Sequence, residues 1–101
     1  MFVYFWGGSK ICTKIQTLNL ANNSISNLRT LNNKNSLYTL NLNNNSIYNN
    51  IFDSKINANV NNVEIIKNLN TSGNLKNIYL LNNKIDDYTE LNKLSFNIKE
   101  W

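Results

Sequence analysis

The chain has 101 residues, of which 42% are hydrophobic and 16% charged, with a formal net charge of +4 and a pI near 9.3. This length excludes two domains but allows one small domain or a few stacked repeats, and the absence of proline with only three glycines excludes a proline- or glycine-rich linker. Nine of the ten basic residues are lysines that occur singly, so no concentrated phosphate-binding patch is predicted and nucleic acid is not an expected partner.

Asparagine is the most unusual feature of the composition, since it makes up about a quarter of the chain, whereas alanine occurs only twice and arginine once. Asn, Lys, Ile, Tyr and Phe are encoded by AT-rich codons, so genome composition accounts for part of this excess. An individual asparagine is therefore evidence of a role only where its position in a pattern is also special.

Residues 1–14 begin with the apolar run MFVYFW, which lacks the basic region and the small-residue cleavage site of a signal peptide. We expect this segment to be an apolar cap on the rest of the chain. No apolar run approaches the roughly 18 residues that a membrane span needs, so no membrane partner is expected. The single cysteine, Cys12, cannot form an intramolecular disulfide, which favours a cytoplasmic or nuclear protein with Cys12 as a small structural residue.

Three segments align without gaps: 15–25 (IQTLNLANNSI), 37–47 (LYTLNLNNNSI) and 75–85 (LKNIYLLNNKI). Each fits the pattern L-x-x-L-x-L-x-x-N-x-I, in which the central L-x-L alternates as a strand does and turns both apolar side chains inward. A strand this short cannot bury its apolar face alone, so we expect the segments to stack into one parallel sheet. The apolar positions are Ile15, Leu18, Leu20 and Ile25, then Leu37, Leu40, Leu42 and Ile47, then Leu75, Ile78, Leu80 and Ile85.

The asparagine of the pattern is Asn23, Asn45 or Asn83 in the three segments. The turn after each strand has partly buried backbone groups that need hydrogen-bond partners. Because a carboxamide both donates and accepts, it can bond to the turns on either side. We therefore predict a structural asparagine ladder at these three positions.

The first two segments begin at Ile15 and Leu37, and their spacing, 37 − 15 = 22, resembles that of the 22-residue subclass of leucine-rich repeats. That subclass includes a regulatory subunit of protein phosphatase 1, axonemal dynein light chain and the spliceosomal A-prime protein. The resemblance implies an α/β solenoid with a short parallel sheet on its concave face and loops and turns on its convex face, to which the long second repeat of this chain adds an inserted helix. It also implies a scaffolding role without catalysis. The repeats so defined are 15–36, 37–74 with an irregular insert at about 48–72, 75–97, and a fourth that starts at 98. Apolar residues in the second halves of the first and third repeats are Leu28 and Leu31, then Tyr88, Leu91 and Leu94.

The spacing between Leu37 and Leu75, 75 − 37 = 38, is too long for one 22-residue repeat and too short for two. One interpretation is a degenerate extra repeat at Val60, Val63, Ile65 and Asn68. The other, which we favour, is an inserted helix ended by Ser72-Gly73, with Tyr48–Lys55 as a loop. The face of that helix would be formed by Ile56, Val60, Val63, Ile66 and Leu69.

The C-terminal residues Ile98-x-x-Trp101 match the first two apolar positions of the pattern, and their spacing from the third segment is 98 − 75 = 23. They predict the opening strand of a fourth repeat. Since no polar cap is visible after it, we expect the chain to be a fragment of a longer protein.

The chain has no histidine, which excludes histidine-based triads, histidine-ligated zinc and histidine acid–base catalysis. The only adjacent acids, Asp86 and Asp87, are predicted to be a solvated loop pair. Gly7-Gly8-Ser9-Lys10 lacks the first glycine of a phosphate loop. We therefore expect no catalytic, cofactor or metal site and no enzyme activity.

The x positions of the strands would form the concave surface, where such solenoids bind other proteins. Tyrosine is favoured at protein interfaces, so Tyr38, Tyr79 and the exposed Leu81 are the main candidate contacts with a protein partner. An ordinary solvated sheet face is the alternative interpretation. Two other functions stay open: an RNA-associated repeat protein like the spliceosomal member, and a regulatory repeat segment of a larger enzyme. The remaining candidate contacts are Thr17, Asn19, Thr39, Asn41, Lys76 and Asn77.

Overall fold

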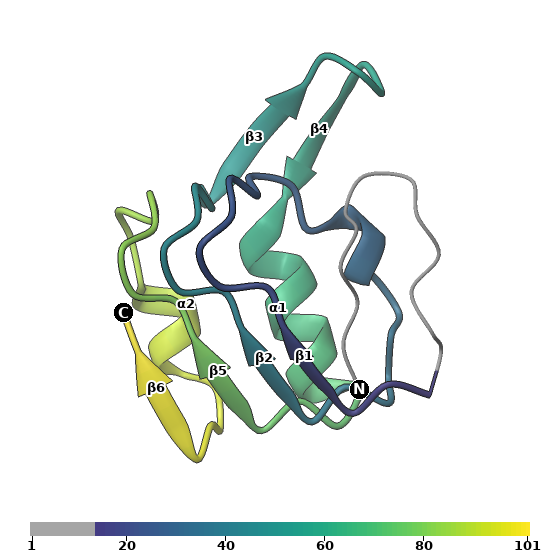
Figure 1. The fold of residues 1–101 in the computed structure, drawn as a ribbon, viewed down its shortest axis with the longest axis vertical. Helices are drawn as coiled ribbons and strands as arrows, with labels where there is room; N and C mark the ends of the chain where they lie inside the picture. The colour runs from purple at the N-terminus through teal and green to yellow at the C-terminus, as the bar shows by residue number, and fades with distance from the viewer. Residues whose placement is uncertain (1–13) are drawn as a thin grey trace.

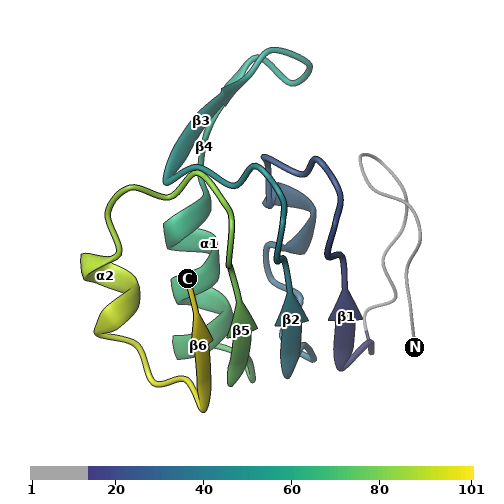
Figure 2. The same cartoon turned by 60° about the vertical axis from the view of Figure 1, so that its left-hand side comes forward.

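The computed structural model describes residues 14–101, so the predictions for the apolar N-terminal segment and for Cys12 lie outside the described residues. The described chain is a small α/β unit built on a four-stranded sheet (Figures 1 and 2). All pairings in this sheet are parallel, and the strand order is β1-β2-β5-β6. The strands are β1 (Thr17–Asn19), β2 (Thr39–Asn41), β5 (Asn77–Tyr79) and β6 (Ile98–Glu100).

The helices gather beside the sheet, where α1 (Asn62–Thr71) contacts both the 3₁₀ helix η1 (Arg29–Leu31) and α2 (Thr89–Asn92) (Figure 2). A separate antiparallel hairpin, β3 (Asn50–Asp53) with β4 (Ala58–Asn61), projects beyond the carboxyl ends of the parallel strands. The molecule therefore has a sheet, a helical layer and one protruding hairpin.

The core forms because the alternation of the strands turns matching apolar residues inward at the same level. The register pairs Leu18 with Leu40 and Leu40 with Ile78, and all three side chains are fully buried. Burying a side chain of this kind contributes about 1.5–3 kcal/mol. The second apolar position of each strand, at Leu20, Leu42 and Leu80, is buried as well, so the core runs without interruption from β1 to β5.

Helix α1 begins at Asn62 because the side chain of Asn61 accepts a hydrogen bond from the Glu64 N–H at 3.0 Å. It ends at Thr71, with Ser72 as its C-cap. A Cβ atom at Gly73 would lie 2.7 Å from the carbonyl oxygen of Leu69, so the chain can turn this closely past the helix end only without a side chain.

The prediction of one inserted helix running from Ile56 to Leu69 is correct only in its second half. Val60 lies in β4, paired with Ile51, and Ile56 lies in the turn of the hairpin. The predicted loop Tyr48–Lys55 contains strand β3. The physical reason is local: β-branched Ile51 and Val60 suit a strand pair, and Asn57 adopts a φ of 50° that interrupts a helix.

The alternative interpretation of this segment, a degenerate repeat on Val60, Val63, Ile65 and Asn68, is also wrong, because the last three of these residues lie in α1.

The predicted C-terminal register is wrong by two positions. Ile98 pairs with Asn77 rather than matching Leu75, and the Asn97 N–H donates to the Lys76 carbonyl at 2.7 Å. Since 98 − 77 = 21, the residue that matches Leu75 is 75 + 21 = 96, which is Phe96. Aromatic side chains explain this register: Phe96 and Trp101 pack against the core, whereas Ile98 is 41% exposed. Phe96 was not predicted at this position because the repeat pattern was defined by aliphatic residues.

Candidate binding surface on the sheet

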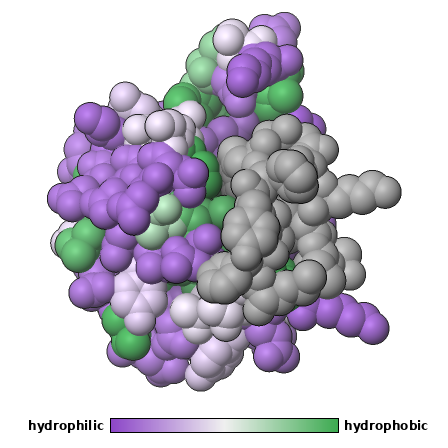
Figure 3. All heavy atoms as spheres, in the orientation of Figure 1, coloured by the Kyte–Doolittle hydropathy of each residue, from purple (hydrophilic) through white to green (hydrophobic). Residues whose placement is uncertain are grey.

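The face of the sheet that is not covered by helices is formed by two rows of side chains, one on each side of a central row that is buried at Leu18, Leu40 and Ile78 and exposed at Lys99. The first row is Thr17, Thr39, Asn77 and Ile98, and the second row is Asn19, Asn41, Tyr79 and Glu100. The predicted contact residues in the strands therefore do lie together on one face. Figure 3 shows that the described surface seen in this view is mostly hydrophilic, with hydrophobic residues on the protruding hairpin.

Direct bonds link neighbouring strands on this face. The Asn77 Nδ2 donates to the Thr39 hydroxyl oxygen at 2.9 Å, and the Asn43 Oδ1 accepts from the Leu81 N–H at 2.8 Å. These bonds hold the polar side chains of this face in fixed positions.

The three main candidates are spread along this face. Tyr38 is 46% exposed, and its carbonyl oxygen accepts the Lys76 N–H at 3.0 Å, so Tyr38 and Lys76 are neighbours at the start of β2 and β5. Leu81, 38% exposed, follows the end of β5, and half-buried Tyr79 lies between the two ends. Tyr38, Tyr79 and Leu81 are thus separated from one another along the direction of the strands.

Two of the three predicted asparagines, Asn45 and Asn83, bond to the turn of the neighbouring segment, as a ladder requires. Asn45 donates from Nδ2 to the carbonyl oxygens of Leu20 (2.9 Å) and Leu42 (3.0 Å), and its Oδ1 accepts from the Ile25 N–H (3.0 Å). Asn83 repeats the arrangement one turn further along, with Leu42 and Leu80 as acceptors and the Ile47 N–H as donor. Asn23 donates within its own turn, to Leu20 at 2.8 Å and Ala21 at 3.1 Å.

A second ladder, which the sequence analysis missed, lies one residue earlier in each segment. Asn44 donates from Nδ2 to Asn22 Oδ1, and Asn82 donates to Asn44 Oδ1, both at 2.7 Å. All three residues have positive φ values, between 58° and 62°, a conformation that asparagine tolerates better than most residues. Each segment contains two adjacent asparagines, at 22–23, 44–45 and 82–83, but the repeat pattern predicts a role only for the second of each pair.

Helix α1 contributes two more buried asparagines. Asn62 accepts from the Leu28 N–H at 2.9 Å and donates to the carbonyls of Ser26 (2.7 Å) and Tyr48 (3.0 Å). Asn70 donates to Leu75 (2.7 Å) and Ser95 (2.9 Å). Both satisfy backbone groups of the turns that flank the helix, and their roles could not be read from a chain so rich in asparagine.

Three acids of the described chain, Asp53, Asp87 and Glu90, have hydrogen-bond or ion-pair partners within the protein. The pKa of Asp87 is lowered chiefly because its carboxylate accepts the Thr89 hydroxyl (2.6 Å) and N–H (2.9 Å). The pKa of Glu90 is lowered by Lys93, whose Nζ lies 2.9 Å away. Asp86 and Asp87 are both exposed, as a solvated loop pair would be.

Burial raises the pKa of Tyr88, whose ring stacks on Trp101 with the ring centroids 5.4 Å apart. Within residues 14–101, no group of three or more Cys, Asp or Glu residues is arranged to hold a metal ion. In the same range, no helix is long and apolar enough to cross a membrane. No family model, curated protein or solved structure matches this chain.

Proposed function

We propose that this chain is a short leucine-rich-repeat solenoid that binds another protein through the open face of its parallel sheet and catalyses no reaction. The observation that supports the proposal most is the register of the sheet. It sets residues 17–19, 39–41 and 77–79 side by side, at the same pattern position in three segments.

The chemistry of this face suits a protein partner. Its strand residues are mainly Thr and Asn, which form hydrogen bonds without the desolvation cost of charges. Tyr38, Tyr79 and Leu81 add apolar area, and tyrosine combines such area with a polar tip. We infer a cytoplasmic or nuclear protein that serves as a scaffold or regulatory module.

The test is affinity capture with the folded chain, followed by measurement of the dissociation constant for the captured protein. We expect Tyr79→Ala to weaken binding by at least tenfold, equivalent to about 1.4 kcal/mol, because a buried interface tyrosine is a common hot spot. The variant should still fold and unfold cooperatively, since Tyr79 lies outside the fully buried core.

The matched control is Tyr48→Ala, because Tyr48 is 42% exposed but lies outside the parallel sheet, in the segment before β3. Equal affinities of Tyr79→Ala and the wild type would remove the sheet face from the binding site. Saturable binding of single-stranded RNA with a steep salt dependence would favour the RNA-associated alternative instead.

A further inference from the structure

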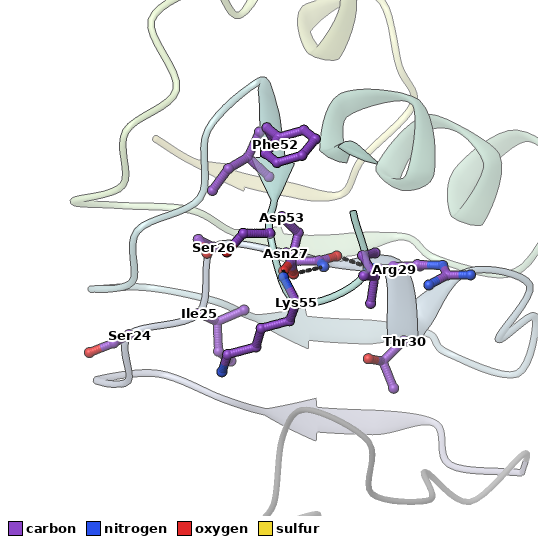
Figure 4. Close-up of a pocket in the computed structure, with 12 residues that line it drawn as sticks. Ser24, Ile25, Ser26, Asn27, Arg29, Thr30, Phe52, Asp53 and Lys55 are labelled. Carbon is purple, nitrogen blue, oxygen red and sulfur yellow. Dashed lines mark hydrogen bonds between the residues drawn. The ribbon is translucent and has the colours of Figure 1, made fainter. Parts of the chain in front are cut away.

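An open groove of about 780 Å³ lies between the protruding hairpin and the chain segment Ser24–Thr30. Its apolar wall includes Ile25, Ile51 and Ile56, the last of which is 38% exposed. In the close-up of Figure 4, Asn27 and Asp53 meet between the segment and the hairpin, joined by a hydrogen bond of 2.5 Å. The hairpin that forms one wall lies beyond the carboxyl ends of the strands (Figure 2), and no residue of the parallel strands lines the groove.

Charge is distributed unequally in the groove. Its one acid, Asp53, is already held by donors from the protein: Asn27 Nδ2 and the Lys55 N–H, the latter at 2.9 Å. Its two cations, Arg29 and Lys55, are exposed, and neither belongs to the ion pair found in residues 14–101, which joins Lys93 to Glu90. Figure 4 shows the two cations extending in different directions from the Asn27–Asp53 contact.

A fitting ligand therefore has to combine carboxylates with apolar side chains. A polyphosphate chain suits the groove less well, because it would bring a continuous negative charge past Asp53 and leave the isoleucines uncovered. An extended peptide places alternate side chains on opposite sides, so one side can fill the apolar wall while carboxylates reach the cations.

We propose that this groove binds an extended acidic peptide segment of a partner protein, with its carboxylates at Arg29 and Lys55 and its apolar side chains against Ile25, Ile51 and Ile56. This site is separate from the sheet face. A failure of peptide binding in the groove would therefore leave the proposed binding at the sheet face unaffected, and the reverse also holds. The hairpin is the insertion that creates it, because it supplies one wall of the groove.

The experiment uses the whole chain in 0.15 M salt and a fluorescein-labelled ten-residue peptide in which aspartate alternates with leucine, followed by anisotropy. We expect saturable binding, and about two- to fivefold weaker binding for each of Arg29→Gln and Lys55→Gln, in keeping with the strength of exposed ion pairs. The matched control is Lys84→Gln, which removes an exposed lysine outside the groove. A peptide that alternates lysine with leucine should not bind.

The site is located by amide chemical shifts, which should change at Ile25 and Ile56 and stay constant at Tyr38 and Tyr79. Ile56→Asp, a substitution in an exposed turn, should abolish binding while the melting temperature stays close to that of the wild type. No saturable binding by the wild type, equal binding of the lysine peptide, or shift changes confined to the sheet face would each overturn the proposal. Tighter binding of a twelve-nucleotide oligouridine that depends on Arg29 and Lys55 would overturn it in favour of RNA.

Discussion

At the scale of single residues, the asparagines of this chain have two kinds of role, one toward backbone groups and one toward other asparagines. Asn45, Asn62 and Asn70 are at most 6% exposed, and each satisfies backbone groups of neighbouring turns. Asn22, Asn44 and Asn82 are exposed, and they combine a positive φ with side-chain bonds to one another. The same residue type therefore replaces the missing backbone partners inside and relieves turn strain outside.

Replacing Asn45 with alanine should lower the free energy of unfolding by about 1–3 kcal/mol. The substitution leaves the Ile25 N–H without its partner, and a buried unsatisfied group costs roughly 1–3 kcal/mol, whereas the Leu20 carbonyl still accepts from Asn23. Urea denaturation followed by circular dichroism measures the change. Asn59→Ala is the control, because Asn59 is exposed in β4 and should change the free energy by less than about 0.5 kcal/mol. Equal effects of the two substitutions would contradict a structural role for the ladder.

The melting temperature should be constant between about pH 5.5 and 7 and should fall in more acidic solution. The chain has no histidine, so no side chain of ordinary pKa titrates in that interval. The pKa values of Asp53, Asp87 and Glu90 are lowered from 3.8 or 4.5 by hydrogen bonds and, for Glu90, by Lys93. The unfolded state therefore binds protons more readily than the folded state, and stability is lost as the pH falls through these values.

Scanning calorimetry at pH 3 to 7 tests this expectation, with Asn27→Ala as the informative variant. Asn27 donates the hydrogen bond that lowers the pKa of Asp53 most, so the variant should lose less stability than the wild type on acidification. A melting temperature that rises toward pH 3 would contradict the expected loss of stability in acid.

At the scale of elements, the β3–β4 hairpin projects from the rest of the fold and contributes few side chains to the core, chiefly Val60 with half-buried Ile51 packed against it. The Asn62 N–H donates to the Asn49 carbonyl at 2.9 Å, so the two ends of the insertion are already adjacent. Within the hairpin strands only Val60 is buried, whereas Phe52 is 57% exposed. The hairpin consequently adds surface rather than core.

Replacing residues 50–61 with a short glycine–serine turn should therefore retain cooperative unfolding and cost about 1.5–3 kcal/mol, the burial of one valine-sized side chain. Circular dichroism melts measure the stability, and the same variant should no longer bind the aspartate–leucine peptide. Loss of all cooperative unfolding would mean that the hairpin is part of the folding unit. Unchanged peptide binding would place that ligand elsewhere.

The strands of the sheet were predictable because their signal comes from apolar spacing, which the asparagine excess does not disturb. Leu18, Leu40 and Ile78 lie at the centre of β1, β2 and β5 as the alternation predicts. The structure of the insert at about 48–72 was harder to predict, since β-branched residues and asparagines occur in both halves of it. Spacings of three and four at Ile56 and Val60 mimicked a helical face by chance.

The candidate site was predictable in part for the same reason. Strand alternation places Thr39, Asn41 and Tyr79 on one face, because their apolar neighbours are buried. The groove beside Arg29 could not be predicted, because it depends on a hairpin that was interpreted as loop and helix. The second ladder, formed by Asn22, Asn44 and Asn82, depends on positive backbone φ values that the spacing of residues in the sequence does not specify.

At the scale of the whole molecule, stability depends on continuity of the core from β1 to β5 and on to the aromatic residues beside β6. Tyr88 stacks on Trp101, and Phe96 packs against the core, so aromatic side chains cover the end at β6. Each strand of the sheet is very short, and none buries its apolar face without its neighbours. The molecule should therefore unfold as one cooperative unit rather than strand by strand.

Leu40→Asp should abolish this cooperative transition. Leu40 is fully buried between Leu18 and Ile78, so a carboxylate there would be desolvated without a partner, at a cost comparable with the whole stability of a small domain. The matched control is Asn41→Asp, which places the same carboxylate one residue along, on the open face, where Oδ1 can still accept the Asn43 N–H. Thermal melts followed by far-ultraviolet circular dichroism should show a sigmoidal transition for the wild type and the control and none for Leu40→Asp. A cooperative melt of Leu40→Asp would mean that the three strands do not share one core.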